Sequence, residues 1–398
     1  MNPSSALPPG REGSDPQLLE EIRRQIRSEG SISFARFMEL ALYHPRWGYY
    51  LRPEDPVSRS GAGDYYTAPT RHPAFGRLLG RQVAQCLEIV GGRERQWVEF
   101  GPGGGHLAAA LLDELRRRGL GPASGVGCTL VEANPHRRAA QESLLRARGL
   151  LEGVRWLTPT AWAESREVLR GCIVANEVLD ALPVHRLIFR DGRYQEIRVS
   201  WKDGLTEVLE PHCGEKLIEW ARAACPEPRE GQELEVGTEV ARFVRTLAAR
   251  LQRGYAILLD YGYLSGEMFS AQHHRGTLLA YHRHLASEEY LQRVGRQDLT
   301  AHVNFTALLE TAGDCGLRAR GPIPQGRLLL ALGALDWLAK SEEDSTLENY
   351  RDRKAVQDLF LPGGMGESHQ AIVLGTAGCD LDLKGLEPME RWDPPRIG

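Results

Sequence analysis

The sequence lacks the features by which several classes of protein are recognised. Its seven cysteines are scattered, odd in number and never spaced as C-x-x-C, which argues against a disulfide framework and a structural zinc site. No apolar run approaches the roughly 18 residues that span a bilayer, so we expect no membrane insertion. The polar N-terminus does not have the charged-then-apolar order of a secretion signal, and we therefore expect a cytoplasmic protein.

An excess of charge is also missing. The 398 residues carry a formal net charge of −4, which gives no electrostatic reason to expect nucleic acid as a partner. The G-x-S-x-G motif that carries the nucleophilic serine of α/β-hydrolases does not occur, which argues against that class of enzyme. The pairs His273-His274 and His282-x-His284 have no acidic or cysteine neighbours at ligand spacing, so we expect no metal.

A regular alternation of strands and helices begins near residue 97. Glycines follow the first short strand, and apolar strands then alternate with amphipathic helices. Strand, helix, strand at this spacing predicts parallel β-α-β units, and hence an α/β fold with a doubly wound, Rossmann-like sheet. The expected strands are 97–100, 127–132, 154–157, 172–175 and 256–260, with a closing strand at 371–375.

Composition divides the chain into four parts. We expect a disordered tail over 1–15, and then an N-terminal helical cap over 16–94 that includes a possible lid loop from Pro53 to Pro73. The Rossmann-like domain would cover 95–183 and 251–398. An insertion on the substrate side would cover 184–250, with turns at Asp191-Gly192 and Asp203-Gly204 and helices over 217–224 and 235–250.

The strongest local signal is the glycine-rich turn after the first strand. Glu99, Gly101, Gly103 and Gly105 match the E/D-x-G-x-G-x-G pattern of S-adenosylmethionine sites. Glycines here let the backbone turn sharply and let a ligand approach the main chain. The acid can face the ammonium group of the cofactor's methionine part. A dinucleotide pattern, G-x-G-x-x-A, fits the same turn, so NAD stays an alternative.

Polar residues also follow two later strands. Glu132 ends the second strand, where an acid can accept both ribose hydroxyls of either cofactor. Asn176, Glu177 and Asp180 follow the fourth strand. If a helix begins there, the two acids lie on similar sides of its first turn and Asn176 caps it. We predict Glu177 and Asp180 as catalytic residues, with Asp260 and His302 next in line.

These motifs resemble the MidA-like methyltransferases, the family of a mitochondrial respiratory complex I assembly factor that methylates an arginine. The resemblance runs from about residue 18 to residue 375 and is carried by several matching stretches. They are Asn176-Glu177-x-x-Asp180-Ala181-x-Pro183-Val184, Ile32 to Tyr50, Gly63 to Pro69, Leu259 to Tyr263, Gly276 to Leu278 and Asp298 to Phe305.

The resemblance implies a class I methyltransferase-like form of the Rossmann-like sheet. It also implies S-adenosyl-L-methionine as cofactor, contacted also by Thr67, Pro69 and Asn176, and transfer of its methyl group to a protein arginine. A complex I subunit is the candidate substrate, and a homodimer is the candidate oligomeric state. The chain departs from the family at 70–73, at His369-Gln370 and before Asp298, all on the substrate side. Alternative functions are an NAD(P)-dependent oxidoreductase and a non-catalytic assembly chaperone that binds the cofactor.

Overall fold

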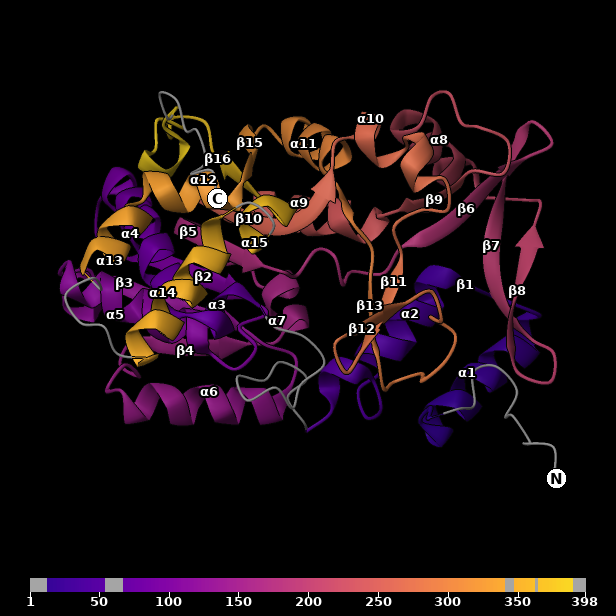
Figure 1. Ribbon diagram of the computed structural model, residues 1–398, viewed down its shortest axis with the longest axis horizontal. Helices are drawn as coiled ribbons and strands as arrows, with labels where there is room; N and C mark the ends of the chain where they lie inside the picture. Colours follow the sequence, from indigo (N-terminus) through magenta and orange to yellow (C-terminus); the bar gives the residue numbers. More distant parts are fainter. Residues whose placement is uncertain (1–12, 54–66, 341–346, 362–363, 389–398) are drawn as a thin grey trace.

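The computed structural model describes residues 13–53, 67–340, 347–361 and 364–388, and its largest element is an eight-stranded sheet (Figure 1). The strand order is β15-β16-β10-β5-β2-β3-β4, and β14 pairs with the end of β10. The strands are β2 (Arg95–Phe100), β3 (Val126–Val131), β4 (Val154–Leu157), β5 (Leu169–Asn176), β10 (Leu251–Tyr263), β14 (Val303–Asn304), β15 (Arg318–Pro324) and β16 (His369–Gly375).

This sheet is doubly wound. Strands β4, β3, β2, β5 and β10 are parallel, and β16 inserts antiparallel between β10 and β15. The chain leaves β2 for β3 on one side and later returns to place β5 on the other side, so the strand order reverses at β2. Ligands of open α/β sheets bind at such a reversal, beyond the carboxyl ends of the strands.

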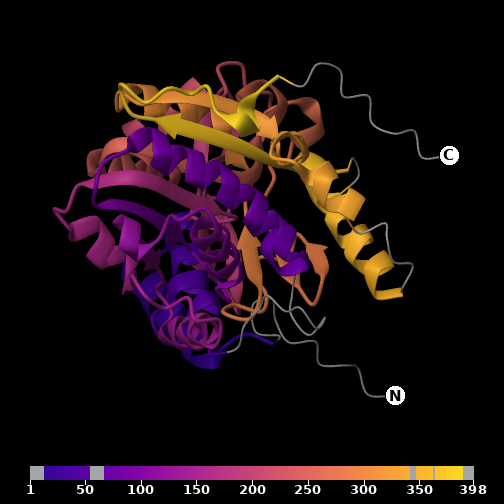
Figure 2. The same cartoon turned by 90° about the vertical axis from the view of Figure 1, so that its left-hand side faces the viewer.

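Helices cover both faces of the sheet, which explains why its strands are apolar throughout. In β5, Cys172 and Val174 pack into the core on one face, whereas Ile173 and Ala175 pack into the core on the other. Figure 2 looks onto the first face, which α4 crosses. The helices of the first face are α4 (Pro73–Val90), α5 (His106–Arg117), α6 (Pro135–Ala147), α12 (Gln325–Ala331) and α14 (Leu347–Phe360), and those of the second are α7 (Pro159–Glu164), α9 (Thr238–Arg250) and α11 (Phe305–Asp314).

The right half of Figure 1 contains the N-terminal helices and two small antiparallel sheets. The N-terminal segment supplies strand β1, which pairs with β7 and so joins the helices to the insertion. Arg186 of β6 is buried here, ion-paired with Glu207 and Glu233 and lying over the rings of Phe34 and Tyr290. The elements are α1 (Pro16–Glu29), β1 (Ile32–Ser33), α2 (Phe34–Tyr43), β6 (His185–Arg190), β7 (Arg193–Trp201), β8 (Leu205–Glu210), α8 (Glu215–Ala224), β9 (Glu233–Val236), α10 (Ser265–Met268), β11 (Leu279–His282), β12 (Leu285–Ser287) and β13 (Asp298–Thr300).

The structure also has short helices: α3 (Ala68–Arg71), α13 (Ala334–Lys340), α15 (Met365–Ser368) and the 3-10 turn η1 (Tyr49–Leu51). Most of the expected loop from Pro53 to Pro73, residues 54–66, lies outside the described residues, as does the tail over 1–12. Within the described ranges, no helix has both the length and the apolar character needed to cross a membrane.

Two expectations from the sequence are wrong. The helix expected over 235–250 begins only at Thr238, because residues 233–236 form strand β9 beside β6. No helix follows Asn176: residues 177–183 form an irregular turn.

Candidate active site

The glycine-rich turn connects β2 to α5 at the carboxyl edge of the sheet. Gly101, Gly103 and Gly105 have φ values of +60°, +51° and +79°, a region that favours glycine. A Cβ at Gly105 would lie 3.1 Å from Cγ of Gln141, whereas a Cβ at Gly103 would meet no protein atom within 4 Å. Gly105 is therefore needed for packing against α6, and Gly103 faces open space where a ligand can reach the backbone.

A side chain that the sequence pattern did not reveal holds this turn. The Gln141 amide nitrogen donates to the Gly103 carbonyl at 2.8 Å and to the Glu132 carboxylate at 2.9 Å. The Trp156 indole donates to the Gln141 carbonyl oxygen at 2.8 Å, which fixes the orientation of the amide. Glu132 also accepts the Asn134 backbone N–H at 2.8 Å. The two predicted cofactor motifs are thus joined by one hydrogen-bonded network.

Glu99 is buried in β2 beneath the turn. Its side chain is 2% exposed, and Oε2 has no hydrogen-bond partner among the described residues. Burial, and secondly the negative charge of Glu132, raise the pKa of Glu99 to about 8. An uncompensated buried carboxyl destabilises the protein unless a cation arrives, so this position suits an ammonium group of a ligand.

The turn after β5 is shaped by a carboxylate from the neighbouring strand. Asp260 in β10 accepts the backbone N–H groups of Val178, Leu179 and Asp180 at 3.1, 2.8 and 3.3 Å. A helix that started here would leave these three N–H groups without an intrahelical partner as well, so in either conformation they need an acceptor from outside the segment. Asp260 is therefore engaged in holding the turn. Glu177 adopts a φ of +51°, which is uncommon for a residue with a side chain and occurs mainly at functional sites.

The turn presents two predicted catalytic acids. Burial, together with the negative charge of Asp180, raises the pKa of Glu177 to about 8. Burial also raises the pKa of Asp180 to about 6, against the effect of the Tyr261 hydroxyl, which donates to Oδ2 at 2.5 Å. Oδ1 of Asp180 has no hydrogen-bond partner among the described residues, although the residue is 5% exposed. Both acids thus have capacity for a cationic ligand.

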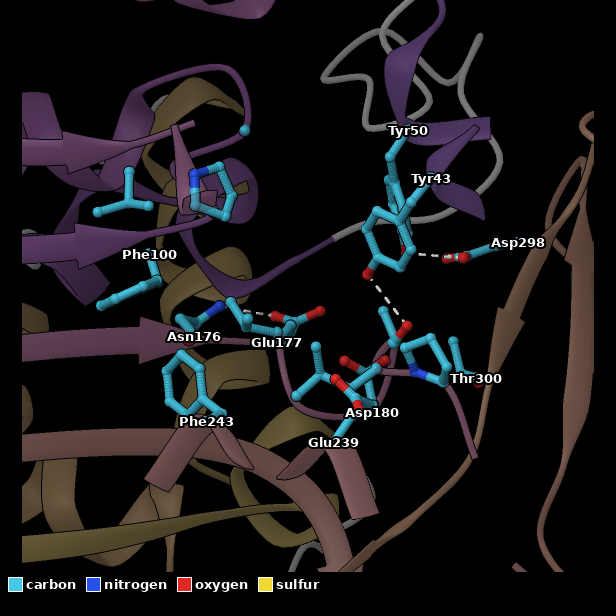
Figure 3. Close-up of a pocket in the computed structure, with 18 of the residues that line it drawn as sticks. Tyr43, Tyr50, Phe100, Asn176, Glu177, Asp180, Glu239, Phe243, Asp298 and Thr300 are labelled. Carbon is cyan, nitrogen blue, oxygen red and sulfur yellow. Dashed lines mark hydrogen bonds between the residues drawn. The ribbon is translucent and has the colours of Figure 1, made fainter. Parts of the chain in front are cut away.

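The opposite wall of the site is formed by residues of α2, η1 and β13 (Figure 3). The Tyr50 hydroxyl donates to Asp298 at 2.7 Å, and the Tyr43 hydroxyl donates to the Ala181 carbonyl at 3.0 Å. Burial raises the pKa of Asp298 to about 8. Asp298 was not predicted as a site residue. The signal that could have selected it is its place at the start of Asp298 to Phe305, one of the stretches that carry the family resemblance.

Asn134 fastens this wall to the Rossmann-like domain. Its side-chain oxygen caps α6 by accepting the backbone N–H of His136 at 2.9 Å. Its amide nitrogen donates to the carbonyls of Tyr50 and Arg52 at 2.8 and 2.7 Å. One residue therefore starts the helix after Glu132 and anchors the segment that carries Tyr50.

A cavity of about 1780 Å³ connects these groups. In Figure 3, Phe100, Phe243 and Asn176 lie at the sheet end, Tyr43, Tyr50 and Asp298 lie at the other end, and Glu177 lies between them. The predicted site residues that line the cavity are Thr67, Pro69, Glu99, Gly101, Gly103, Glu132, Asn176, Glu177, Asp180 and His302. Gly105 and Asp260 do not line it. Among the described residues, no group of histidines, cysteines and acids could hold a metal ion.

This strand order, with its glycine turn, two strand-end acids and an open cavity at the reversal point, defines a Rossmann-like methyltransferase of class I. Residues 78–323 match the family model described as "Putative S-adenosyl-L-methionine-dependent methyltransferase". The chain belongs to this family. The match decides against the NAD(P)-dependent alternative.

Named relatives cover nearly the whole chain. "Protein arginine methyltransferase NDUFAF7 homolog, mitochondrial" from Drosophila melanogaster is 30% identical, over 92% of this chain and 86% of the relative. The protein named "Protein arginine methyltransferase NDUFAF7, mitochondrial" from Danio rerio is 26% identical, over 90% of this chain and 87% of its own. These names contradict the cytoplasmic location that we expected, because they place the relatives in mitochondria.

A solved structure agrees with both fold and cofactor. A protein from Burkholderia thailandensis bound to S-adenosyl-homocysteine is 34% identical, with a TM-score of 0.84 over 93% of this chain and 94% of the other. The chain is therefore an S-adenosyl-L-methionine-dependent methyltransferase, as the sequence predicted. The residues present fit this cofactor, since Glu99 offers a buried acceptor oxygen, Gly103 an open approach and Glu132 a carboxylate directly after β3 that lines the same cavity.

Proposed function

We propose that the enzyme methylates arginine side chains of a protein. The observation that supports this most directly is the cluster of buried carboxyl groups, Glu177, Asp180 and Asp298, all lining one cavity next to the predicted cofactor site. Carboxylates can bind a guanidinium group through paired hydrogen bonds. The names of the relatives, protein arginine methyltransferases, point to the same substrate class.

Each of the predicted cofactor-site residues has its own proposed role in binding. When bound, S-adenosyl-L-methionine supplies an electrophilic methyl group. Glu99 would accept the ammonium group and Glu132 the ribose hydroxyls, while Gly101, Gly103 and Gly105 would let the backbone approach. Asn176, Thr67 and Pro69 would line the space next to the reactive end. Gln141 would keep Glu132 and the glycine turn in register through its hydrogen bonds to both.

Glu177 and Asp180 would act on the acceptor. A guanidinium cation between them favours their charged forms and so lowers the raised pKa of each carboxyl. The free Oδ1 of Asp180 and the Glu177 carboxylate could then orient the planar group and localise electron density on the attacking nitrogen. A lysine ammonium, a compact point charge, would not use such separate acceptors as well.

The test is methylation of arginine-containing peptides, and then of a complex I subunit, followed by mass spectrometry. Among whole proteins, a complex I subunit is the first to be tested because of the sequence resemblance to the family of a complex I assembly factor. We expect a gain of about 14 mass units per methyl group in the arginine peptide and none in a matched lysine peptide. Glu177→Gln and Asp180→Asn should lower turnover about a hundredfold or more with S-adenosylhomocysteine affinity nearly unchanged.

Glu239→Gln is the matched control. Glu239 also lines the cavity, but its carboxylate pairs with Arg242 at 2.8 Å, so we expect nearly normal turnover. Full turnover in both Glu177→Gln and Asp180→Asn would refute their catalytic assignment. Binding of the protein substrate without any mass gain would instead support the assembly chaperone. The oligomeric state, for which a homodimer is our proposal, can be measured by light scattering on the same samples.

A further inference from the structure

His369 is the first residue of β16, and the topology brings it into the active-site cavity. Because β16 runs antiparallel to β10, it starts at the edge where the parallel strands end, with His369 opposite Tyr261. The residue is 7% exposed and lines the cavity. Its Nε2 lies 3.9 Å from Oε1 of Glu177 and has no hydrogen-bond partner among the described residues.

The other side of the ring reaches the surface. Nδ1 lies 3.0 Å from the hydroxyl of Ser368, which is exposed. With Nδ1 engaged there, Nε2 is available to a group in the cavity, and Glu177 is the acid within reach. The imidazole is thus placed between a buried carboxyl and a hydroxyl in contact with solvent.

The charges around the pair favour a shared proton over two separate charges. Burial lowers the pKa of His369 to about 4, so its Nε2 lone pair is unprotonated at neutral pH, whereas the raised pKa of Glu177 keeps a proton on the carboxyl. The groups that face the pair are Asp180 on the turn, Asp260 and Tyr261 on β10, and Asp298 on β13. The Asn176 amide also donates to Oε1 of Glu177, at 3.1 Å. His302 packs on the other part of the Tyr261 ring.

We propose that His369 is the proton-accepting partner of Glu177, and that the pair holds the proton released when an arginine is methylated. This rests on the proposed function. The S–CH₃ bond breaks, with its electron pair kept by sulfur, and an N–CH₃ bond forms. The N–H bond of the attacking nitrogen breaks, and its proton joins the Glu177 carboxylate, which then donates it in a hydrogen bond to Nε2 of His369. It leaves to solvent on the Ser368 side after the product departs.

The geometry allows this contact with a small adjustment. A distance of 3.9 Å is too long for a hydrogen bond, and a closure of about 1 Å would bring it to the usual range. Catalytic hydrogen bonds are often long in ligand-free enzymes and tighten in the complex.

The first experiment compares His369→Gln with His369→Phe in steady-state methylation of an arginine peptide. Glutamine can hydrogen-bond to Glu177 but cannot accept a proton, so we expect kcat to fall about tenfold or more in both variants. The KM for the peptide and the affinity for S-adenosylhomocysteine should stay within about twofold. A kcat equal to wild type in His369→Gln would overturn the proposal, because a hydrogen-bonding side chain would then suffice.

The second experiment does not depend on activity or on the stability of a His369 variant. The ¹⁵N shifts of the histidine rings are measured by NMR in the wild-type protein and in Glu177→Gln. Loss of the shared proton should move the Nε2 signal of His369, while the signals of His302, which has no close contact with Glu177, serve as control. An unchanged His369 signal would overturn the pairing. If the wild-type enzyme methylates no arginine, the proposed function fails, and this measurement still decides the pairing.

Discussion

Replacement of Gly103 by alanine separates the conformational role of a glycine from its role in ligand binding. The backbone at Gly103 has a φ of +51°, and an added Cβ meets no protein atom within 4 Å. The loss of stability should therefore come only from the left-handed backbone, about 1 to 2 kcal/mol. The new methyl group would point into the space that we assign to the cofactor.

Gly119 provides the matched control. It follows α5, has a φ of +73°, and its Cβ would also meet nothing within 4 Å, but it does not line the cavity. Gly119→Ala should lose the same 1 to 2 kcal/mol or so of unfolding free energy. Only Gly103→Ala should weaken S-adenosylhomocysteine binding, by tenfold or more, equivalent to about 1.4 kcal/mol or more.

Urea unfolding gives the stability of both variants, and titration calorimetry gives the affinity. Wild-type affinity in Gly103→Ala would refute the reasoning, because the cofactor would then not approach the backbone at this turn. An equal loss of affinity in Gly119→Ala would show that the effect passes through global stability instead of local contact.

Other predictions test the acid, the anchor and the buried ion pair. The pKa of Glu99 is raised from 4.5 to about 8 in the folded protein, so wild-type stability should fall as pH rises through that window. Glu99→Gln should remove this pH-dependent loss of stability, so the variant should gain more stability over the wild type near pH 8 than near pH 4.5. The same variant should bind S-adenosylhomocysteine more weakly. Asn134→Asp keeps the helix cap but loses the donors to the carbonyls of Tyr50 and Arg52, so the peptide KM should rise more than the cofactor affinity falls. Arg186→Ala removes a buried cation that pairs with the exposed Glu207 and the half-buried Glu233 and packs over Phe34 and Tyr290. It should cost about 1 to 3 kcal/mol in urea unfolding, whereas a loss of less than about 0.5 kcal/mol would contradict a structural role for these contacts.

Local patterns predicted where the residues of the proposed cofactor half of the site lie, because each of its parts is encoded in a short stretch. Apolar strands followed by glycines, and acids at strand ends, placed Glu99, Gly103 and Glu132 on one edge of the sheet, and the structure has them there. Only the connection between them was missed. Gln141 looks like an ordinary polar helix residue, and nothing in its neighbours indicates that it bonds to Gly103 and Glu132.

The acceptor half could not be predicted in the same way, because it is assembled from distant segments. Tyr50 and Asp298 are 248 residues apart in the chain and are joined by one hydrogen bond. The sequence near Glu177 suggested a helix, and that prediction failed because Glu177 has a φ of +51° and Pro183 has no N–H for a helical bond. Asp260, from another strand, instead accepts the N–H groups of Val178 and Leu179 and so holds the turn. Long-range hydrogen bonds therefore stabilise the one turn where the chemistry is proposed.

The distribution of buried charge links these two halves. Glu99 at the cofactor end and Glu177 and Asp298 at the acceptor end all have raised pKa values because burial opposes their ionisation. A folded protein gains nothing from such groups on their own, and each lowers its stability at neutral pH. Two ligands that each bring a positive charge, a sulfonium cofactor with its ammonium group and a guanidinium acceptor, would relieve that cost at opposite ends of one cavity. Methyl transfer removes the sulfonium charge and releases a proton, so the cavity then holds less compensation than before, and this favours departure of the products.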